Sequence, residues 1–408
     1  MTFLIMRDSN VAGIYDRRHK AACRLWIKLG GIEQPGPQGT AMTPNSQSIQ
    51  PPALFDSRYS DRPYIAIWEV TRACDLACVH CRATAESKSY PGELNTRQAL
   101  NLIRQVAEWK VPLFVMTGGD PLKREDLMIL VGECAKRGMN FALAPSVTPL
   151  LTRSKLRQLR ESGVNRISLS LDGADAVTHD NFRGIPGTYD RFLEASQNIR
   201  DLGIHLQINT TISRHNKSQV WEMAQAIRRF SIDLWSVFFL VPTGRAQKDQ
   251  ALNATETEKV LNQLFDILKQ GWFDIKTTEA HHFRRVILQR YGVKPSELPE
   301  VIQKQPDPVL LRTSRGVGDG RGFVFISHTG DVCPSGFLPI PGGSVKNQPL
   351  AEIYQKNELF QTLRNADALQ GKCGRCEYRA LCGGSRARAF ALAGDVMAAD
   401  PFCSYQPS

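Results

Sequence analysis

The sequence lacks any apolar run of about eighteen residues, the minimum for a membrane-spanning helix. Polar and charged residues interrupt every short apolar run near its start, so the pattern of a signal peptide is absent too. Despite a net charge of +11, there is no dense Lys/Arg run with interleaved aromatic residues. These absences predict a cytoplasmic protein that binds neither membrane nor nucleic acid. The positive charge suits either a carboxylate-rich small molecule or a plain solvated surface.

Cysteine is plentiful, and its spacing is uneven. Seven of the ten cysteines fall into two groups. Clustered thiols in a cytosolic chain indicate metal binding rather than disulfide bonds. The first group, here called the triad, is Cys74, Cys78 and Cys81; the second, called the tetrad, is Cys373, Cys376, Cys382 and Cys403.

Residues 1–58 differ in composition from the rest. A mildly basic stretch is followed by a Pro/Gly/Ser/Gln-rich segment from Gln34 to Pro52. Such a segment has little to bury, so a flexible N-terminal extension is expected. Met42 is an alternative start of translation.

Residues 59–272 predict six strand–helix units. Nearly continuous apolar strands that alternate with helices favour a parallel sheet with helices outside, curled into a full or partial (βα)6 barrel. The expected strands are 64–70, 112–116, 140–144, 166–171, 205–212 and 234–241, and the expected helices are 96–110, 124–137, 152–162, 189–202, 217–230 and 255–270.

Residues 273–408 predict a smaller α+β module. A strand over 273–277 and a helix over 279–291 come first, and a Pro/Gly-rich loop is expected over 294–319. A β-hairpin is expected around the turn at 328–331.

The triad directly follows the first predicted strand. In a parallel barrel the loops after the strands form the active face. Three thiolates on one short loop suit three irons of a [4Fe–4S] cluster and leave the fourth iron open for a ligand. Zinc or three structural thiols are the alternatives.

The CxxxCxxC spacing at this position resembles the radical S-adenosylmethionine (SAM) superfamily. The resemblance implies that SAM binds the open iron and is reductively cleaved to a 5′-deoxyadenosyl radical, with the triad as the catalytic centre. It also implies SAM-binding roles for other residues, for which turn or cap formation is the alternative. These residues are His80 near the adenine, the loop Gly118, Gly119, Asp120 and Pro121 near the amino group, and Ser170, Asp172 and Asn209 near the ribose and carboxylate.

The tetrad resembles the part of a C-terminal SPASM/twitch module that builds one auxiliary [4Fe–4S] cluster. A structural zinc site is the alternative. A full module has another cysteine where this chain has Arg386, which argues against a second auxiliary cluster. Cys333 is then expected to be an unliganded or substrate-facing thiol.

Four motifs carry a finer resemblance: residues 68–74, 118–121, 334–338 and 373–376. Between Arg62 and Pro401 the chain resembles the SPASM/twitch radical SAM enzymes of alternative haem biosynthesis, which include the iron-coproporphyrin decarboxylase and the enzymes that assemble d-type haem. The resemblance implies an oxidoreductase or lyase that removes carboxylate groups from a tetrapyrrole such as an iron porphyrin, with ferredoxin or flavodoxin as reductant. Arginine is well suited to bind propionates. The candidates are Arg284 and Arg285 beside His281 and His282, with Arg312, Arg315 and Arg321 behind them. Ordinary charge on surface helices and loops is the alternative.

Two other functions stay open. The same architecture serves enzymes that modify ribosomal peptides, although this chain has no obvious peptide-recognition domain. A non-catalytic iron–sulfur electron carrier would explain the cysteines but not the polar loops that follow the strands.

Overall fold

The computed structural model describes residues 58–407. The expected N-terminal extension, including Met42 and Cys23, lies outside these residues except for its last position.

Ten strands of the described chain form one sheet in the order β10-β9-β8-β1-β2-β3-β4-β5-β6-β7. Every ladder from β8 through β1 to β7 is parallel, whereas β9 and β10 are added antiparallel. The strands are β1 (Ile65–Glu69), β2 (Leu113–Thr117), β3 (Phe141–Leu143), β4 (Arg166–Ser170), β5 (His205–Ile212), β6 (Leu234–Phe239), β7 (Asp274–Thr278), β8 (Phe323–Ile326), β9 (Asp331–Cys333) and β10 (Gly343–Ser344).

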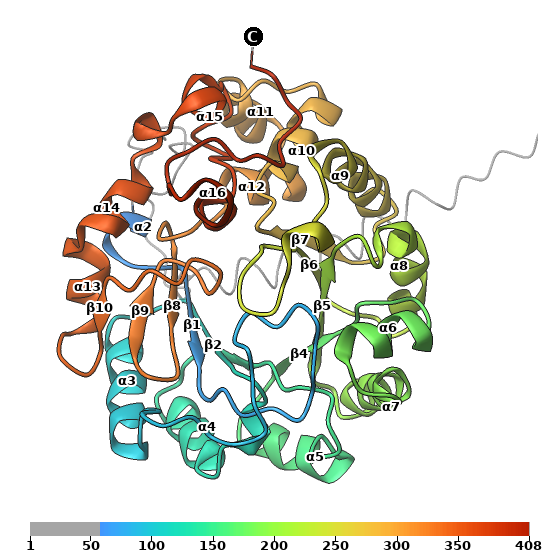
Figure 1. Ribbon diagram of the computed structural model, residues 1–408, viewed down its shortest axis with the longest axis vertical. Coiled ribbons are helices and arrows are strands. Elements are labelled where there is room, and N and C mark those ends of the chain that lie inside the picture. Colours follow the sequence, from blue (N-terminus) through green and yellow to red (C-terminus); the bar gives the residue numbers. More distant parts are fainter. Residues whose placement is uncertain (1–57, 408) are drawn as a thin grey trace, which may run out of the picture.

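The parallel strands form an arc with the helices on its outside (Figure 1). Within the described residues no ladder joins β7 to β8, so the barrel is open there. The α-helices are α2 (Arg58–Asp61), α3 (Thr96–Glu108), α4 (Leu127–Lys136), α5 (Arg153–Glu161), α6 (Ala176–Arg183), α7 (Thr188–Asp201), α8 (Val220–Arg228), α9 (Ala254–Leu268), α10 (Phe283–Tyr291), α11 (Leu298–Lys304), α12 (Pro308–Ser314), α13 (Leu350–Lys356), α14 (Glu358–Arg364), α15 (Gly371–Arg375) and α16 (Arg386–Ala393).

The local sequence explains these elements. Helix α3 begins at a capping box in which Asn95 accepts from the backbone of Gln98, and the Gln98 side chain accepts from Asn95. Strand β5 alternates strictly between buried and partly exposed residues. Its buried side chains, such as Ile208, pack in the core beneath the helices, while Gln207 and Asn209 face the inside of the arc. The inside of the barrel is therefore polar along this strand.

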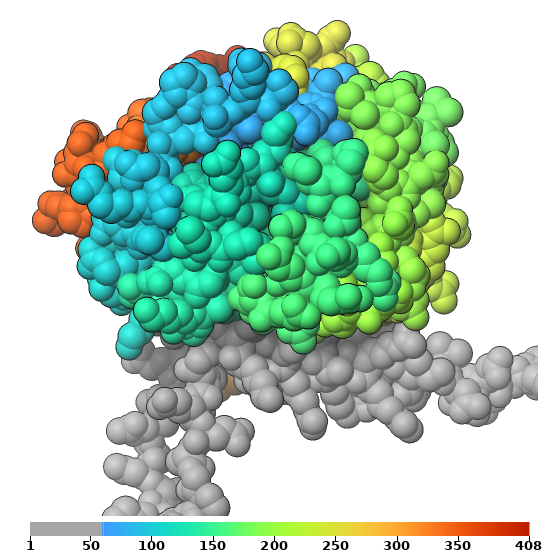
Figure 2. All heavy atoms as spheres, turned by 90° about the horizontal axis from the view of Figure 1, so that it is seen from below, coloured from blue at the N-terminus to red at the C-terminus, as the bar shows by residue number. Residues whose placement is uncertain are grey.

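All six strands expected in residues 59–272 are observed, with ends displaced by at most two residues. The expected hairpin is formed by β8 and β9. On the face seen in Figure 2, the segments lie side by side in chain order, from cyan to yellow-green. This is the arrangement that consecutive strand–helix units produce.

The expectation of a loop over 294–319 is wrong. The segment contains α11 and α12, and in both helices a proline stands at one of the first two positions. Proline is tolerated there because its missing N–H would have no helical partner. The prolines therefore begin these helices rather than interrupt them. Helix α6, after β4, was also not expected.

The sheet continues across the predicted domain boundary at 272/273. Strand β7 pairs with β6, and β8 pairs with β1, so the C-terminal module contributes strands to both edges of the barrel sheet. No helix among residues 58–407 is long and apolar enough to cross a membrane.

Candidate active site and cysteine clusters

The triad lies on the loop that leaves the carboxyl end of β1. Cys74 and Cys78 are buried and Cys81 is half-buried, and all three pack in one small apolar cluster with Leu76 and Ala85. Backbone N–H groups of Leu76 and Ala85 donate to the sulfurs of Cys74 and Cys81, at 3.4 and 3.5 Å. Burial raises the pKa of the Cys74 and Cys78 thiols, which coordination to a metal would offset.

The glycine loop after β2 packs directly against the triad loop. A Cβ at Gly119 would lie 2.4 Å from the carbonyl oxygen of Ala73, and one at Gly118 would lie 2.6 Å from that of Thr71. Backbone N–H groups of Gly119 and Asp120 donate to these same carbonyls, at 2.8 and 2.6 Å. Glycine is required here because two backbones meet, whether or not a ligand also approaches.

The Asp120 carboxylate is fully buried and used within the protein. It accepts from the backbone of Leu122 at 3.1 Å, from the backbone of Ser146 at 3.3 Å and from the Thr148 hydroxyl at 2.7 Å. The Ser146 hydroxyl in turn lies 3.4 Å from the Cys74 sulfur. Asp120 therefore fixes the loops after β2 and β3 beside the triad.

Asp172 is also fully buried, just after β4. Its carboxylate accepts from the backbone of Thr211 at 2.7 Å and forms an ion pair with Arg183. The guanidinium of Arg183 also lies 3.6 Å from the Cys78 sulfur. A cation thus stands between the predicted SAM-binding carboxylate and the triad, and the sequence analysis missed Arg183.

The other predicted SAM-binding residues lie around the same mouth. The His80 ring packs against Phe182 at 4.2 Å between centroids. Burial lowers the pKa of His80 well below its usual value, so the ring is neutral, and its Nδ1 has no partner in the described chain. Ser170 and Asn209 lie opposite each other in the β4–β5 ladder.

The tetrad lines one cavity of about 380 Å³ at the C-terminal end of the chain. The backbone N–H of Asp400 donates to the Cys373 sulfur and that of Gly384 to the Cys382 sulfur, both at 3.4 Å. Burial raises the pKa of Cys376 to about 11 and of Cys382 to about 12. In the described chain no three His, Cys, Asp or Glu side chains converge on the position of a single metal ion. Four soft sulfur donors around one cavity suit an iron–sulfur cluster.

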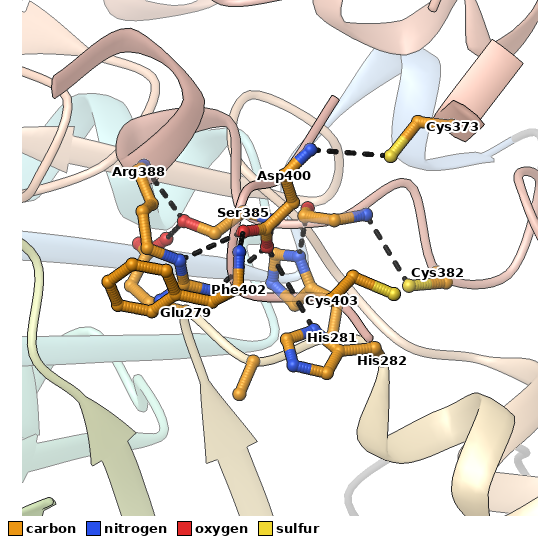
Figure 3. A network of polar contacts seen from close by, with 12 residues as sticks. Glu279, His281, His282, Cys373, Cys382, Ser385, Arg388, Asp400, Phe402 and Cys403 are labelled. Atoms are coloured by element: carbon orange, nitrogen blue, oxygen red, sulfur yellow. Dashed lines mark hydrogen bonds and ion pairs between the residues drawn. The ribbon is translucent and has the colours of Figure 1, made fainter. Parts of the chain in front are cut away.

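A buried polar network supports the tetrad (Figure 3). Asp400 accepts two hydrogen bonds from Arg388, at 2.9 and 2.8 Å, and one from the backbone of Ser385 at 2.8 Å. The Ser385 hydroxyl donates to Glu279 at 2.5 Å. The network therefore connects the loop that carries Cys403 to the residue that follows β7.

Arg284 and Arg285, which are predicted to bind propionates, form hydrogen bonds with other protein groups. Arg285 pairs with Glu258, and its guanidinium lines the tetrad cavity. Arg284 donates to the carbonyls of Leu381 and Val317, at 2.7 and 2.5 Å. His282 is fully buried, 3.9 Å from Asp400. These contacts do not favour the predicted role, which stays a prediction.

Glu69, at the end of β1, is the centre of a charged cluster that the sequence analysis did not predict. Its carboxylate accepts from Arg82 at 2.5 Å and lies 2.7 Å from Nδ1 of His328. Burial alone would raise the pKa of Glu69, but Arg82 and His328 outweigh it and lower the pKa to about 2. The group ties the triad loop to the β8–β9 turn.

Lys276 on β7 was also missed. It stands beside Ser236 in the β6–β7 ladder, which in turn stands beside Asn209 of β5, so the three share the inner face of the sheet. The ammonium group has no hydrogen bond or ion pair in residues 58–407. Burial and then the charge of Arg284 lower its pKa to about 8. Apolar–polar alternation could have revealed it, but the expected strand at 273–277 was assigned no site.

Comparison with known proteins decides the family. The sequence profile of the Radical SAM superfamily matches residues 68–227. The AdoMet-dependent heme synthase of Nitratidesulfovibrio vulgaris is 41% identical over 343 residues, covering 83% of this chain and 92% of that protein. The chain belongs to the radical SAM superfamily. It is therefore an enzyme, and its cofactors are SAM and a [4Fe–4S] cluster.

Further comparisons agree. The AdoMet-dependent heme synthase of Methanosarcina barkeri is 36% identical over 354 residues, covering 85% of this chain and 98% of that protein. Among solved structures, Streptococcus suis SuiB bound to S-adenosylmethionine superimposes with a TM-score of 0.66 at 16% identity, covering 85% of this chain and 78% of that one. The latter likeness concerns the fold alone.

Proposed function

We propose that this radical SAM enzyme synthesises haem by oxidative decarboxylation of the propionate side chains of an iron porphyrin, iron-coproporphyrin III. The observation that supports this substrate is the sequence similarity to heme synthases of two organisms over more than four-fifths of the chain. The polar inner face of the barrel, with Gln207, Asn209 and Lys276, supports a bound substrate that carries anionic groups.

We assign the cysteines to two clusters. The triad would hold the [4Fe–4S] cluster at which SAM binds, and the tetrad would hold an auxiliary [4Fe–4S] cluster. When bound, the first cluster supplies the electron that cleaves SAM, and the second supplies an acceptor for the electron left after CO₂ departs. Ferredoxin or flavodoxin is the proposed reductant.

The protein's own residues orient these groups. Asp120 and Ser146 fix the loops beside Cys74, and Arg183 stands beside Cys78 with Asp172 as its counter-ion. The neutral His80 ring, held against Phe182, would contact the adenine. Burial of Cys74 and Cys78 would limit the access of water to the cluster.

The test is anaerobic reconstitution with iron and sulfide, followed by dithionite, SAM and iron-coproporphyrin III. Mass spectrometry should detect the loss of carboxyl groups from the porphyrin together with 5′-deoxyadenosine. The Cys78→Ala variant should form neither product, whereas Cys134→Ala, which removes a buried thiol of α4, should form both. Formation of 5′-deoxyadenosine while the porphyrin stays unchanged would support the proposed radical chemistry and contradict the proposed substrate.

A further inference from the structure

A second cavity lies beside the tetrad cavity. Its volume is about 340 Å³, and it is bounded by the loop 318–321 on one side and the segment 382–386 on the other. Arg379, Cys382, Gly383 and Gly384 line both cavities. A ligand in the second cavity would therefore be separated from the tetrad by a single loop.

The walls of this second cavity are cationic. Arg321, Arg379 and Arg386 line it, while Asp319 is the lining carboxylate. Asp319 is already bound by the backbone N–H groups of Arg386 and Ala387, at 3.0 and 3.1 Å, and makes no ion pair with the Arg386 guanidinium within the described chain. Among the charged residues that line the cavity, three are arginines and one is an aspartate.

Arg386 has buried hydrogen-bond donors that lack an acceptor in the described chain. The residue is only 5% exposed, and its Nη1 donates to the carbonyls of Val396 and Ala398 at 2.8 and 2.7 Å. Its Nε and Nη2 are buried and have no partner in the described chain. Leaving such donors unmet is costly, and more so on a charged group. Nε and Nη2 form the edge of a guanidinium that binds a carboxylate through two parallel hydrogen bonds.

Glycine keeps a side chain away from that edge. A Cβ at Gly384 would lie 2.8 Å from Nη2 of Arg386, and the φ of +66° at this position also favours glycine. Arg386 itself occupies the position at which a full SPASM module would have a cysteine. An arginine here replaces a metal ligand with an anion-binding group.

We propose that this second cavity binds propionate carboxylates of the porphyrin substrate, with Arg386 as the bidentate partner and Arg321 and Arg379 as supporting cations. The inference rests on the proposed function, because it takes the carboxylates to be those of iron-coproporphyrin III. It replaces Arg284 and Arg285, whose guanidinium groups are bonded to protein groups, with Arg386, whose Nε and Nη2 have no partner in the described chain, as the main propionate ligand. It also brings the substrate next to the loop that carries Cys382.

The test measures porphyrin binding to the reconstituted holoenzyme by Soret titration. Arg386→Gln and Arg379→Gln should each weaken the binding of iron-coproporphyrin III by about tenfold, the effect of one charge-assisted contact. Neither should change the weak binding of the tetramethyl ester, which has no carboxylates and is presented in detergent micelles. Arg386→Lys should also bind less tightly, because lysine has no bidentate edge.

Asp367→Asn is the matched control. Arg379 pairs with the exposed Asp367 at 3.0 Å, so this variant breaks the same ion pair but keeps the cation of the cavity. Its affinity for iron-coproporphyrin III should be equal to or greater than that of the wild type. Iron content and melting temperature, measured on every variant, would identify a loss of structure. If Arg386→Gln fails to fold, the porphyrin affinity of Arg379→Gln tests the proposed carboxylate site.

The outcomes separate the two hypotheses. If the wild type decarboxylates the porphyrin and Arg379→Gln binds it as tightly as Asp367→Asn does, the inference is wrong and the proposed function stands. If the wild type neither binds nor decarboxylates the porphyrin, the proposed function is wrong and the inference falls with it.

Discussion

Arg388 and Asp400 form an ion pair in which neither side chain is exposed, with Nε and Nη2 of the arginine 2.9 and 2.8 Å from the two carboxylate oxygens. The backbone N–H of the same aspartate donates to the sulfur of Cys373. The pair therefore stabilises the fold and positions a proposed cluster ligand at the same time.

The Asp400→Asn variant should lower both the free energy of unfolding and the iron content. It leaves the Arg388 charge buried without a counter-ion, which costs about 3–5 kcal/mol. About half of the iron should be lost, since only the auxiliary cluster depends on this loop. Denaturant unfolding and iron analysis measure the two effects. The control is Asp266→Asn, which breaks the exposed pair with Arg290 and should cost less than about 1 kcal/mol.

Substitution of Cys382 and substitution of Cys333, both in the C-terminal module, should affect the iron content differently. Cys382→Ala removes one of four thiols around the tetrad cavity and should lose about half of the iron. Cys333→Ala should keep all of it, because Cys333 lies in β9 opposite Phe325 and does not line that cavity. Iron loss in Cys333→Ala would instead identify Cys333 as a ligand.

The Glu69→Gln variant should change stability on the acid side. Arg82 and His328 outweigh burial and hold the pKa of Glu69 at about 2, below its unfolded value of 4.5. The charged form therefore contributes stability that is complete above pH 4.5 and lost as the pH falls toward 2. The shift corresponds to about 3 kcal/mol at pH 7. Melting temperatures should show a gap between wild type and variant at pH 7 that narrows below pH 4.5. A constant gap would mean that packing, not charge, is lost.

The Glu279→Gln variant should have the opposite pH dependence. Burial and the nearby Asp319 raise the pKa of Glu279 to about 8. Ionisation is therefore easier in the unfolded chain, and the wild type loses stability as the pH rises from 4.5 to 8. The variant cannot ionise, so its free energy of unfolding should exceed that of the wild type increasingly over this range, by on the order of 1 kcal/mol or more at pH 8, and its melting temperature should rise accordingly. Equal pH profiles for the two proteins would show that Glu279 is ionised at neutral pH.

Local patterns made much of this structure predictable. The strands of the barrel are short apolar runs, as in β2, or alternate between apolar and polar residues, as in β5. The triad and most of the tetrad lie close together in the sequence. Contacts between distant residues were not predictable. Glu69 meets His328, 259 positions later, and Glu279 meets Ser385, 106 positions later. The sequence suggested that Arg285 is available to bind an anion, but in the folded chain it forms an ion pair with Glu258. Charge alone does not reveal which basic residues the fold neutralises.

The Lys276→Met variant should be more stable than the wild type and less active. The lowered pKa of Lys276, about 8, means that its ammonium form is disfavoured by burial in the folded protein. Methionine removes that cost, so the free energy of unfolding at pH 7 should rise by about 1–3 kcal/mol. The gain should shrink above pH 8, where the folded wild type carries a neutral amine. If the lysine faces an anionic substrate inside the barrel, porphyrin turnover should fall at least tenfold. Lys155→Met, on the exposed face of α5, should change neither quantity. A variant that is stabilised yet fully active would show that Lys276 lies in the barrel without a role in substrate binding.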